Sequence, residues 1–167
     1  AAWASSLLSA PSGDGTGLFS FFVNEMNLIA TEIGLRDTYF LNPTGLDLAP
    51  ERAGAYGTAE EWARLMAWVL LRSSETIFAT QASELDIHSL DGVLHSVSSS
   101  AEPALSIPGL IGVKTGFTDL AGGNVALAWT AGGRHFVIVV LGSTVDGRFS
   151  DALTLYGATM DFIKVAR

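Results

Sequence analysis

The hydrophobic pattern of the N-terminal third predicts helices separated by loops. Residues 1–10 have the apolar character of the end of a helix, and the glycine-rich residues 11–17 predict a loop. A helix is predicted over residues 18–33, where apolar side chains recur every three or four positions, and Gly34 provides a C-cap. The apolar positions of this helix are Phe22, Met26, Ile29 and Ile33. Proline and glycine within residues 42–45 then predict a turn.

Two further amphipathic segments predict helices in the middle and at the end of the chain. Thr58 and Glu61 have the spacing of a capping box, in which each side chain accepts a hydrogen bond from the backbone amide of the other. The helix that starts there is expected to run to about Arg72. Residues 147–165 predict a closing helix. The side chains on or near its apolar face are Phe149, Leu153, Tyr156, Met160 and Ile163.

Turn residues and short apolar runs predict strands in the second half of the chain. Residues 85–97 predict a hairpin that turns at Asp91 and Gly92. Three more strands are predicted after it, and the glycine-rich turn at residues 131–133 makes the last two of them neighbours in an antiparallel meander. These strands span residues 112–117, 124–129 and 135–141.

The order of these elements predicts an α+β fold. A chain of 167 residues is long enough to bury a core without a disulfide or metal. Helices come first and strands follow, which favours an antiparallel sheet with packed helices plus a helical lobe. We expect the helical lobe within residues 1–80, and the hairpin, the three strands and the closing helix within residues 81–167.

Composition excludes several classes of function. The net charge is −8, from 9 basic and 17 acidic residues, and no basic stripe is present to neutralise a phosphate backbone, so no nucleic-acid partner is expected. The longest apolar runs, residues 65–71 and 136–141, are shorter than the roughly 18 residues that a membrane span requires. The absence of cysteine excludes disulfides, thiolate metal ligands and cysteine nucleophiles.

Most active-site signatures are missing from the sequence. His88, His95 and His135 lie far apart and lack HExxH spacing, so neither a metal nor another cofactor is expected. Lys114 follows a valine instead of the glycine of a P-loop, and no strand leads into the glycines of residues 13–17 as a dinucleotide fingerprint requires. A Gly-x-Ser-x-Gly elbow is absent, although a Ser-His-Asp triad assembled from distant residues stays open.

One string in the last third has side chains suited to binding a carboxylate. On a strand, Lys114, Gly116 and Thr118 point to one face, and Thr115 and Phe117 point to the other. Gly116 allows a ligand backbone to approach the strand, while the Lys114 ammonium and two threonine hydroxyls supply donors for a peptide carboxylate. The alternative interpretation is an ordinary strand with a surface lysine and a glycine bulge.

Longer segments on both sides of Lys114-Thr115-Gly116 identify a family. In order, they are residues 22–27, 32–35, 38–47, 58–63 and 108–122. Together they resemble the serine D-Ala-D-Ala carboxypeptidases, the low-molecular-mass penicillin-binding proteins, over nearly the whole chain. Lys-Thr-Gly is the third motif of the penicillin-recognising serine enzymes, after Ser-x-x-Lys and Ser-x-Asn. The resemblance implies the β-lactamase-like transpeptidase fold.

The resemblance also implies a mechanism and a site. In this family a serine attacks the peptide bond between the two D-alanines that end the peptidoglycan stem peptide, an acyl-enzyme forms, and water releases the shortened peptide. β-Lactams acylate the same serine. By resemblance, Lys114 is catalytic and binds the terminal carboxylate with Thr115, the Phe117 N–H is an oxyanion-hole donor, and Gly116 and Thr118 complete the substrate-binding strand. The expected partners are stem peptides and β-lactams, outside the cytoplasmic membrane.

The first two motifs of the family are not found in the chain. Ile111 and Asp161 stand three residues before the two lysines, where Ser-x-x-Lys requires a serine. Residues 12–14, Ser-Gly-Asp, resemble Ser-x-Asn but lie too close to the following helix, and residues 98–100 are serines where the family often has asparagines. We therefore expect the C-terminal part of a catalytic domain, incomplete at its N-terminus, which is folded and active only with the N-terminal portion of the same domain.

Three other interpretations remain. The chain is compatible with a catalytically inactive module that holds stem peptides or β-lactams through the Lys-Thr-Gly strand, and binding without turnover would indicate it. It is also compatible with a β-lactamase of the same superfamily, which the rate of deacylation would reveal. The third is a structural domain unrelated to the family.

Overall fold

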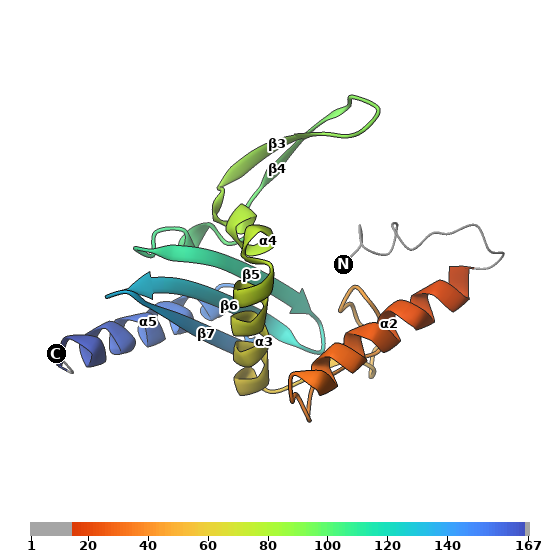
Figure 1. Ribbon diagram of the computed structural model, residues 1–167, viewed down its shortest axis with the longest axis horizontal. Coiled ribbons are helices and arrows are strands. Elements are labelled where there is room, and N and C mark those ends of the chain that lie inside the picture. Colours follow the sequence, from red (N-terminus) through yellow and green to blue (C-terminus); the bar gives the residue numbers. More distant parts are fainter. Residues whose placement is uncertain (1–14, 166–167) are drawn as a thin grey trace.

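The computed structural model describes residues 15–165, in which helices pack against antiparallel strands, and the predicted α+β class is confirmed (Figure 1). The helices are α2 (Gly15–Glu32), α3 (Ala59–Arg72), α4 (Ser74–Phe78) and α5 (Gly147–Val165), with the 3-10 helices η1 (Ala79–Gln81) and η2 (Glu102–Ala104). The strands are β1 (Tyr39–Phe40), β2 (Ala55–Tyr56), β3 (Glu84–His88), β4 (Leu94–Ser98), β5 (Leu110–Thr118), β6 (Gly122–Ala131) and β7 (Arg134–Ser143). The helix expected at residues 1–10 and the Ser-Gly-Asp string at residues 12–14 lie outside the described residues.

The three longest strands form the sheet that the sequence predicts. β5, β6 and β7 are neighbours in that order, and both pairs are antiparallel. Gly132 and Gly133 join β6 to β7 with φ of +57° and +76°, a backbone that matches the twist of the two strands. The predicted meander is confirmed, and each strand extends beyond its predicted ends.

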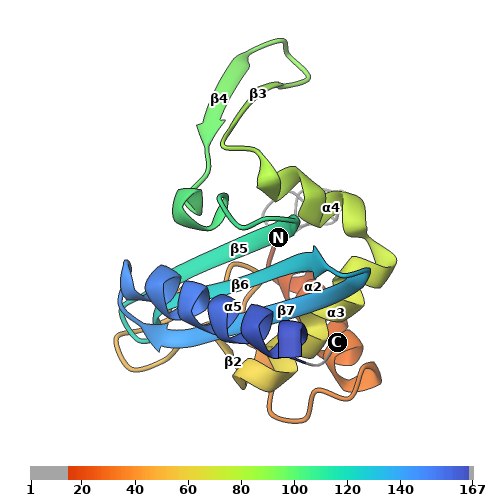
Figure 2. The ribbon, with the colours of Figure 1, turned by 90° about the vertical axis from the view of Figure 1, so that its left-hand side faces the viewer.

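Alternate side chains of β6 point to opposite faces of this sheet, and each face has a hydrophobic core. Val125, Leu127 and Trp129 are at most 1% exposed and pack with Phe149 of α5 in one cluster. Ala128 points to the opposite face, where the second cluster includes a methionine of α3. α5 therefore covers one face of the sheet, and α3 and α4 lie on the other (Figure 2).

The buried side of α5 differs from the prediction at one position. Ala152 is 1% exposed and belongs to the core, whereas Leu153 is 39% exposed. Phe149 and Tyr156 contact the core as expected. Residues 149, 152 and 156 follow the i, i+3, i+7 spacing of one helix face, which leaves Leu153 at the margin of that face.

α2 begins three residues earlier than predicted, so the loop expected at residues 15–17 is wrong. Glycine lowers helix stability most in the interior, whereas these residues occupy the first turn, whose N–H groups have no intrahelical partners in any helix. The end of α2 is as predicted. The Leu35 N–H donates to Ala30 O (2.8 Å), the Gly34 N–H donates to Thr31 O (3.0 Å), and Gly34 has a φ of +80°. This is a Schellman C-cap.

Only half of the predicted capping box forms at the start of α3. The Thr58 hydroxyl accepts a hydrogen bond from the Glu61 N–H (3.2 Å). The Glu61 carboxylate instead accepts hydrogen bonds from the N–H groups of Arg36 (2.7 Å) and Asp37 (3.1 Å) and from the Thr38 hydroxyl (2.6 Å). Contacts with a distant segment therefore replace the reciprocal half of the box, and they fasten α3 to the chain that follows α2.

We expect Glu61→Gln to lower the melting temperature at neutral pH. Glu61 is 7% exposed. The Thr38 hydroxyl, with the Asp37 and Arg36 N–H groups, holds its pKa below the ordinary 4.5 against the opposing effect of burial. A lowered folded-state pKa stabilises the fold above pH 4.5, and this stabilisation is lost as the pH falls through the folded-state value. The difference in melting temperature between wild type and variant should therefore shrink below pH 4.5. Glu60→Gln is the matched control because its side chain is 74% exposed, and identical melting curves for the two variants would contradict the prediction.

β3 and β4 form the predicted hairpin, which projects away from the sheet (Figures 1 and 2). The last paired residues of the two strands are His88 and Leu94, so residues 89–93 form a five-residue loop. The two-residue turn predicted at residues 91–92 is therefore wrong. Backbone hydrogen bonds from Ser89 to Val93 and from Gly92 to Ser89, each 2.9 Å, close this wider loop. All ten strand residues of the hairpin are exposed.

Candidate active site

The predicted site residues lie on β5 and line one cavity of about 860 Å³. They are Lys114, Thr115, Gly116, Phe117 and Thr118. Lys114 lies opposite Ala126 of β6, and Thr115 lies opposite Val125. Val125 belongs to the core under α5, and paired residues point to the same face of a sheet, so Thr115 also faces α5. Lys114, the preceding residue, therefore faces the other side of the sheet, toward α3. The structure therefore brings the whole string together around one cavity, with the predicted alternation of faces.

The wall opposite β5 comes from α3 and from the loop at residues 44–57. The Asn42 side chain shapes the start of this loop by accepting a hydrogen bond from the Gly45 N–H (2.7 Å), and Gly45 has a φ of +77°. The predicted turn at this position is therefore confirmed. Asp47 then accepts a hydrogen bond from the Leu120 N–H (3.1 Å), which fastens the loop to the turn after β5.

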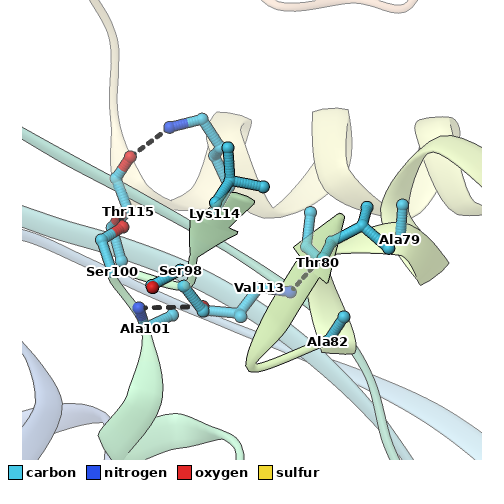
Figure 3. A pocket seen from close by; sticks show the side chains of 12 residues that line it. Ala79, Thr80, Ala82, Ser98, Ser100, Ala101, Val113, Lys114 and Thr115 are labelled. Atoms are coloured by element: carbon cyan, nitrogen blue, oxygen red, sulfur yellow. Dashed lines mark hydrogen bonds between the residues drawn. The ribbon is translucent and has the colours of Figure 1, made fainter. Parts of the chain in front are cut away.

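The outer edge of β5, away from β6, is free of strand pairing within residues 15–165. Near its start, the Val113 N–H donates to the hydroxyl of Thr80 in η1 (2.9 Å; Figure 3). Alternate residues of an antiparallel strand direct their N–H and C=O groups to the same side. The backbone groups of Thr115 and Phe117 therefore also face this outer edge.

The side chains of the string have distinct surroundings. The Thr115 and Ser100 hydroxyls form a hydrogen bond of 2.7 Å across the outer edge. The Thr118 hydroxyl accepts a hydrogen bond from the Ala121 N–H (3.0 Å), so it also stabilises the turn after the strand. Phe117 is 51% exposed at the rim of the cavity. The hydroxyl of Thr115 is thus paired with Ser100 at the outer edge, whereas that of Thr118 is engaged with the backbone.

Lys114 is an exposed cation that has no acidic partner within residues 15–165. Its ammonium donates a hydrogen bond to the Thr115 carbonyl. Partial burial lowers the pKa of Lys114 below the ordinary 10.5, and the nearby positive charge of Arg148 lowers it further. The ion pairs within residues 15–165 are Arg64–Glu60 and Lys164–Asp161, so no carboxylate in this part of the chain neutralises Lys114.

Arg148, at the start of α5, belongs to this site although the sequence did not predict it. The residue is 7% exposed, its guanidinium donates to the Gly116 carbonyl (2.8 Å), and it lies 4.8 Å from the centroid of the Phe149 ring. Its Nε is buried without a hydrogen-bond partner in the described residues. A cation in the first turn of a helix opposes the helix dipole. This unfavourable placement is the sequence signal that indicates a different role for Arg148, namely its contact with the Gly116 carbonyl.

The fold is that of the penicillin-binding proteins: helices cover both faces of an antiparallel sheet, and the edge strand of this sheet carries the Lys-Thr-Gly string. The chain belongs to the D-alanyl-D-alanine carboxypeptidase family, whose family model matches residues 15–145. It is 31% identical over 123 residues to D-alanyl-D-alanine carboxypeptidase DacF of Bacillus subtilis, a match that covers 74% of this chain and 30% of DacF.

Solved structures give the same picture of the fold. Penicillin-binding protein D2 from Listeria monocytogenes, in its cefotaxime-bound form, matches with a TM-score of 0.70 and 27% identity over 86% of this chain and 55% of D2. A variant of the Streptomyces K15 DD-transpeptidase matches with a TM-score of 0.76 and 23% identity over 92% of this chain and 60% of the enzyme. The chain thus spans less than two thirds of the length of each of these relatives.

Within residues 15–165, every helix is too short or too polar to cross a membrane.

Proposed function

We propose that this chain provides the substrate-binding strand of a serine-type D-Ala-D-Ala carboxypeptidase that acts on peptidoglycan stem peptides. The observation that carries the proposal is the pair of cations at β5. Lys114 lines the cavity, Arg148 contacts the Gly116 carbonyl, and neither forms an ion pair within residues 15–165. A terminal D-alanine or a β-lactam brings a carboxylate that complements both charges. This role supports an extracytoplasmic place of action, where peptidoglycan is found.

The edge of β5 supplies the other contacts in the proposed reaction. A peptide that lies along Thr115 and Phe117 pairs with an unoccupied strand edge, and Gly116 leaves room for its backbone. A serine oxygen attacks the carbonyl between the two D-alanines while the Phe117 N–H donates to the developing oxyanion. The C–N bond breaks, and D-alanine leaves with the proton that the serine hydroxyl has lost. Water then hydrolyses the ester and restores the serine.

The nucleophile in this scheme comes from the N-terminal portion of the same domain. Neither lysine of the chain has a serine three residues before it. The cavity beside β5 has apolar walls that include Trp62, Val139 and Leu141, and the outer edge of β7 is unpaired within residues 15–165. Such surfaces are suited to cover by further strands and a helix. In this arrangement residues 1–80 belong to the helical lobe and residues 81–167 to the sheet lobe.

A fluorescent penicillin tests this proposal. The chain alone should show no covalent labelling, because it lacks Ser-x-x-Lys. The complete catalytic domain, meaning this chain joined to an N-terminal portion that carries Ser-x-x-Lys, should be labelled and should release D-alanine from a D-Ala-D-Ala peptide. Labelling of the chain alone would reveal a nucleophile within these 167 residues and contradict the division of roles.

The missing Ser-x-x-Lys also favours a second candidate, a module that binds stem peptides without cleaving them. Equilibrium binding of a D-Ala-D-Ala peptide by the complete domain, with no release of D-alanine, would support it. A β-lactamase of the same superfamily would instead release hydrolysed penicillin rapidly, so the rate of deacylation separates it from the carboxypeptidase.

A further inference from the structure

The Thr115 hydroxyl has a partner outside the Lys-Thr-Gly string. Its oxygen lies 2.7 Å from the hydroxyl oxygen of Ser100, the usual length of a hydrogen bond between hydroxyl groups. Ser100 is 15 residues earlier in the chain, between β4 and η2. A residue from a separate segment therefore contacts the side chain that, with Lys114, is proposed to bind the ligand carboxylate.

The segment that carries Ser100 is anchored on both sides. The Ser99 N–H donates to the Ser83 carbonyl at the base of the hairpin (2.7 Å), and the Ala101 N–H donates to the Ser99 hydroxyl (3.2 Å). Ala101 is 4% exposed and belongs to the core under α5. Both neighbours of Ser100 are thus fixed, so its hydroxyl is held beside the outer edge of β5.

A cavity of about 290 Å³, smaller than the one described above, opens beside this pair of hydroxyls (Figure 3). Ser100, Thr115 and Lys114 all line it, whereas the larger cavity is lined by Thr115 and Lys114 without Ser100. Thr115 therefore borders both spaces, and Ser100 borders only the smaller one. A ligand in the larger cavity can reach the Thr115 hydroxyl, so an effect of Ser100 on that ligand passes through Thr115.

The number of protons on the two hydroxyls determines what the pair can do. Each hydroxyl carries one proton and can also accept hydrogen bonds. The bond between Ser100 and Thr115 uses one of the two protons, and within residues 15–165 neither hydroxyl has a second partner. One proton is therefore left for a ligand. When Ser100 is the donor, Thr115 keeps its own proton, and accepting one hydrogen bond strengthens the next one that it donates.

The electrostatic surroundings of the pair favour an anionic acceptor for this proton. Lys114 is the one charged residue among the described residues that line the smaller cavity. Its ammonium donates to the carbonyl of Thr115, the residue that carries the hydroxyl, and no carboxylate within residues 15–165 pairs with it. A ligand carboxylate can therefore accept from both the ammonium and the hydroxyl, and hydrogen bonds to an ionised acceptor are about twice as strong as neutral ones.

We propose that Ser100 is a positioning residue for the ligand carboxylate: its hydroxyl donates to Thr115 and thereby orients the Thr115 proton toward that carboxylate. The inference rests on the proposed carboxypeptidase function. It extends the carboxylate site to a segment that the Lys-Thr-Gly string does not include.

The test compares turnover of two ligands by the complete catalytic domain. One is an N-acetylated peptide that ends in D-Ala-D-Ala, and the other is the same peptide with a terminal carboxamide, which has the shape of the carboxylate without its charge. Ser100→Ala should lower kcat/KM roughly tenfold for the acid and roughly threefold for the amide, because the charge-assisted bond is the stronger one. The ratio of acid to amide turnover should therefore fall roughly threefold, a change that a loss of stability alone does not produce.

Two matched variants make this test specific to the hydroxyl of Ser100. Ser100→Thr keeps a hydroxyl at this position and should restore most of the wild-type ratio. Ser98→Ala removes a hydroxyl from another serine that lines the same small cavity, and it should keep the wild-type ratio.

A double variant tests whether Ser100 acts through Thr115. Thr115→Val keeps the shape of the side chain without its hydroxyl, and in this background Ser100→Ala should not change the ratio further. A wild-type ratio in Ser100→Ala, or the same threefold fall in the Thr115→Val background, would overturn the positioning role and leave the proposed function intact. Failure of the unmodified complete domain to release D-alanine from the acid would overturn the proposed function as well.

Discussion

Lys114→Ala is expected to slow acylation of the complete catalytic domain by carboxylate-bearing ligands roughly 10- to 150-fold, equivalent to about 1.5–3 kcal/mol. The reason is the loss of a charge-assisted hydrogen bond to the ligand carboxylate. The ammonium has no acidic partner within residues 15–165, so its removal leaves no carboxylate of the described chain uncompensated. The effect should therefore concentrate on ligand acylation, measured as the second-order rate constant with a fluorescent penicillin.

Lys164→Ala is the matched control, because the chain has only these two lysines. Lys164 lies on α5, where its side chain is 72% exposed and paired with Asp161 at 3.0 Å. Exposed pairs of this kind contribute little to stability, so the control should acylate at the wild-type rate. If Lys114→Ala acylates as fast as Lys164→Ala, the carboxylate-binding role of Lys114 is wrong.

Local signals were enough to predict most of the three-stranded sheet. The apolar runs of β5, β6 and β7 and the glycine pair at residues 132–133 specify strands and a turn within a few residues of one another. Gly34 and Thr58 likewise act on their own helix ends, and both caps are present in the structure. The Lys114 string lies on a strand for the same reason, because its neighbours in the sheet are close in sequence.

The errors and omissions concern contacts between distant residues. Glu61 has the correct spacing for a capping box, but its carboxylate bonds to Asp37 and Thr38, which come 24 and 23 residues earlier. Arg148 reaches the Gly116 carbonyl from 32 residues away. Neither partner leaves a periodic trace in the sequence, since the fold alone brings these residues together. The structure therefore brings the predicted residues together along β5, and the prediction omitted Arg148 beneath the strand.

Gly116→Ala is expected to raise the activation free energy of acylation by about 1–3 kcal/mol, which slows acylation roughly 5- to 150-fold, without destabilising the fold. A Cβ at this position would meet only the Cβ of Asn124 in the described structure, at 4.0 Å, which is an ordinary contact. Gly116 is not among the glycines with positive φ, so alanine fits its backbone and should raise stability by up to about 1 kcal/mol. The added methyl group instead occupies the space through which the proposed ligand backbone approaches the strand.

Gly112→Ala, four residues earlier on the same strand and on the same face, should have the opposite consequence. There a Cβ would lie 2.2 Å from the Ile77 Cγ2 atom and 2.6 Å from the Ile77 carbonyl oxygen, so α4 must shift. We expect a loss of about 1–3 kcal/mol of stability, measured by denaturant unfolding. The pair separates two reasons for a glycine in β5: close packing at residue 112 and an open ligand path at residue 116. If Gly116→Ala destabilises the fold as much as Gly112→Ala, or if it acylates at the wild-type rate, then Gly116 has no role in ligand approach.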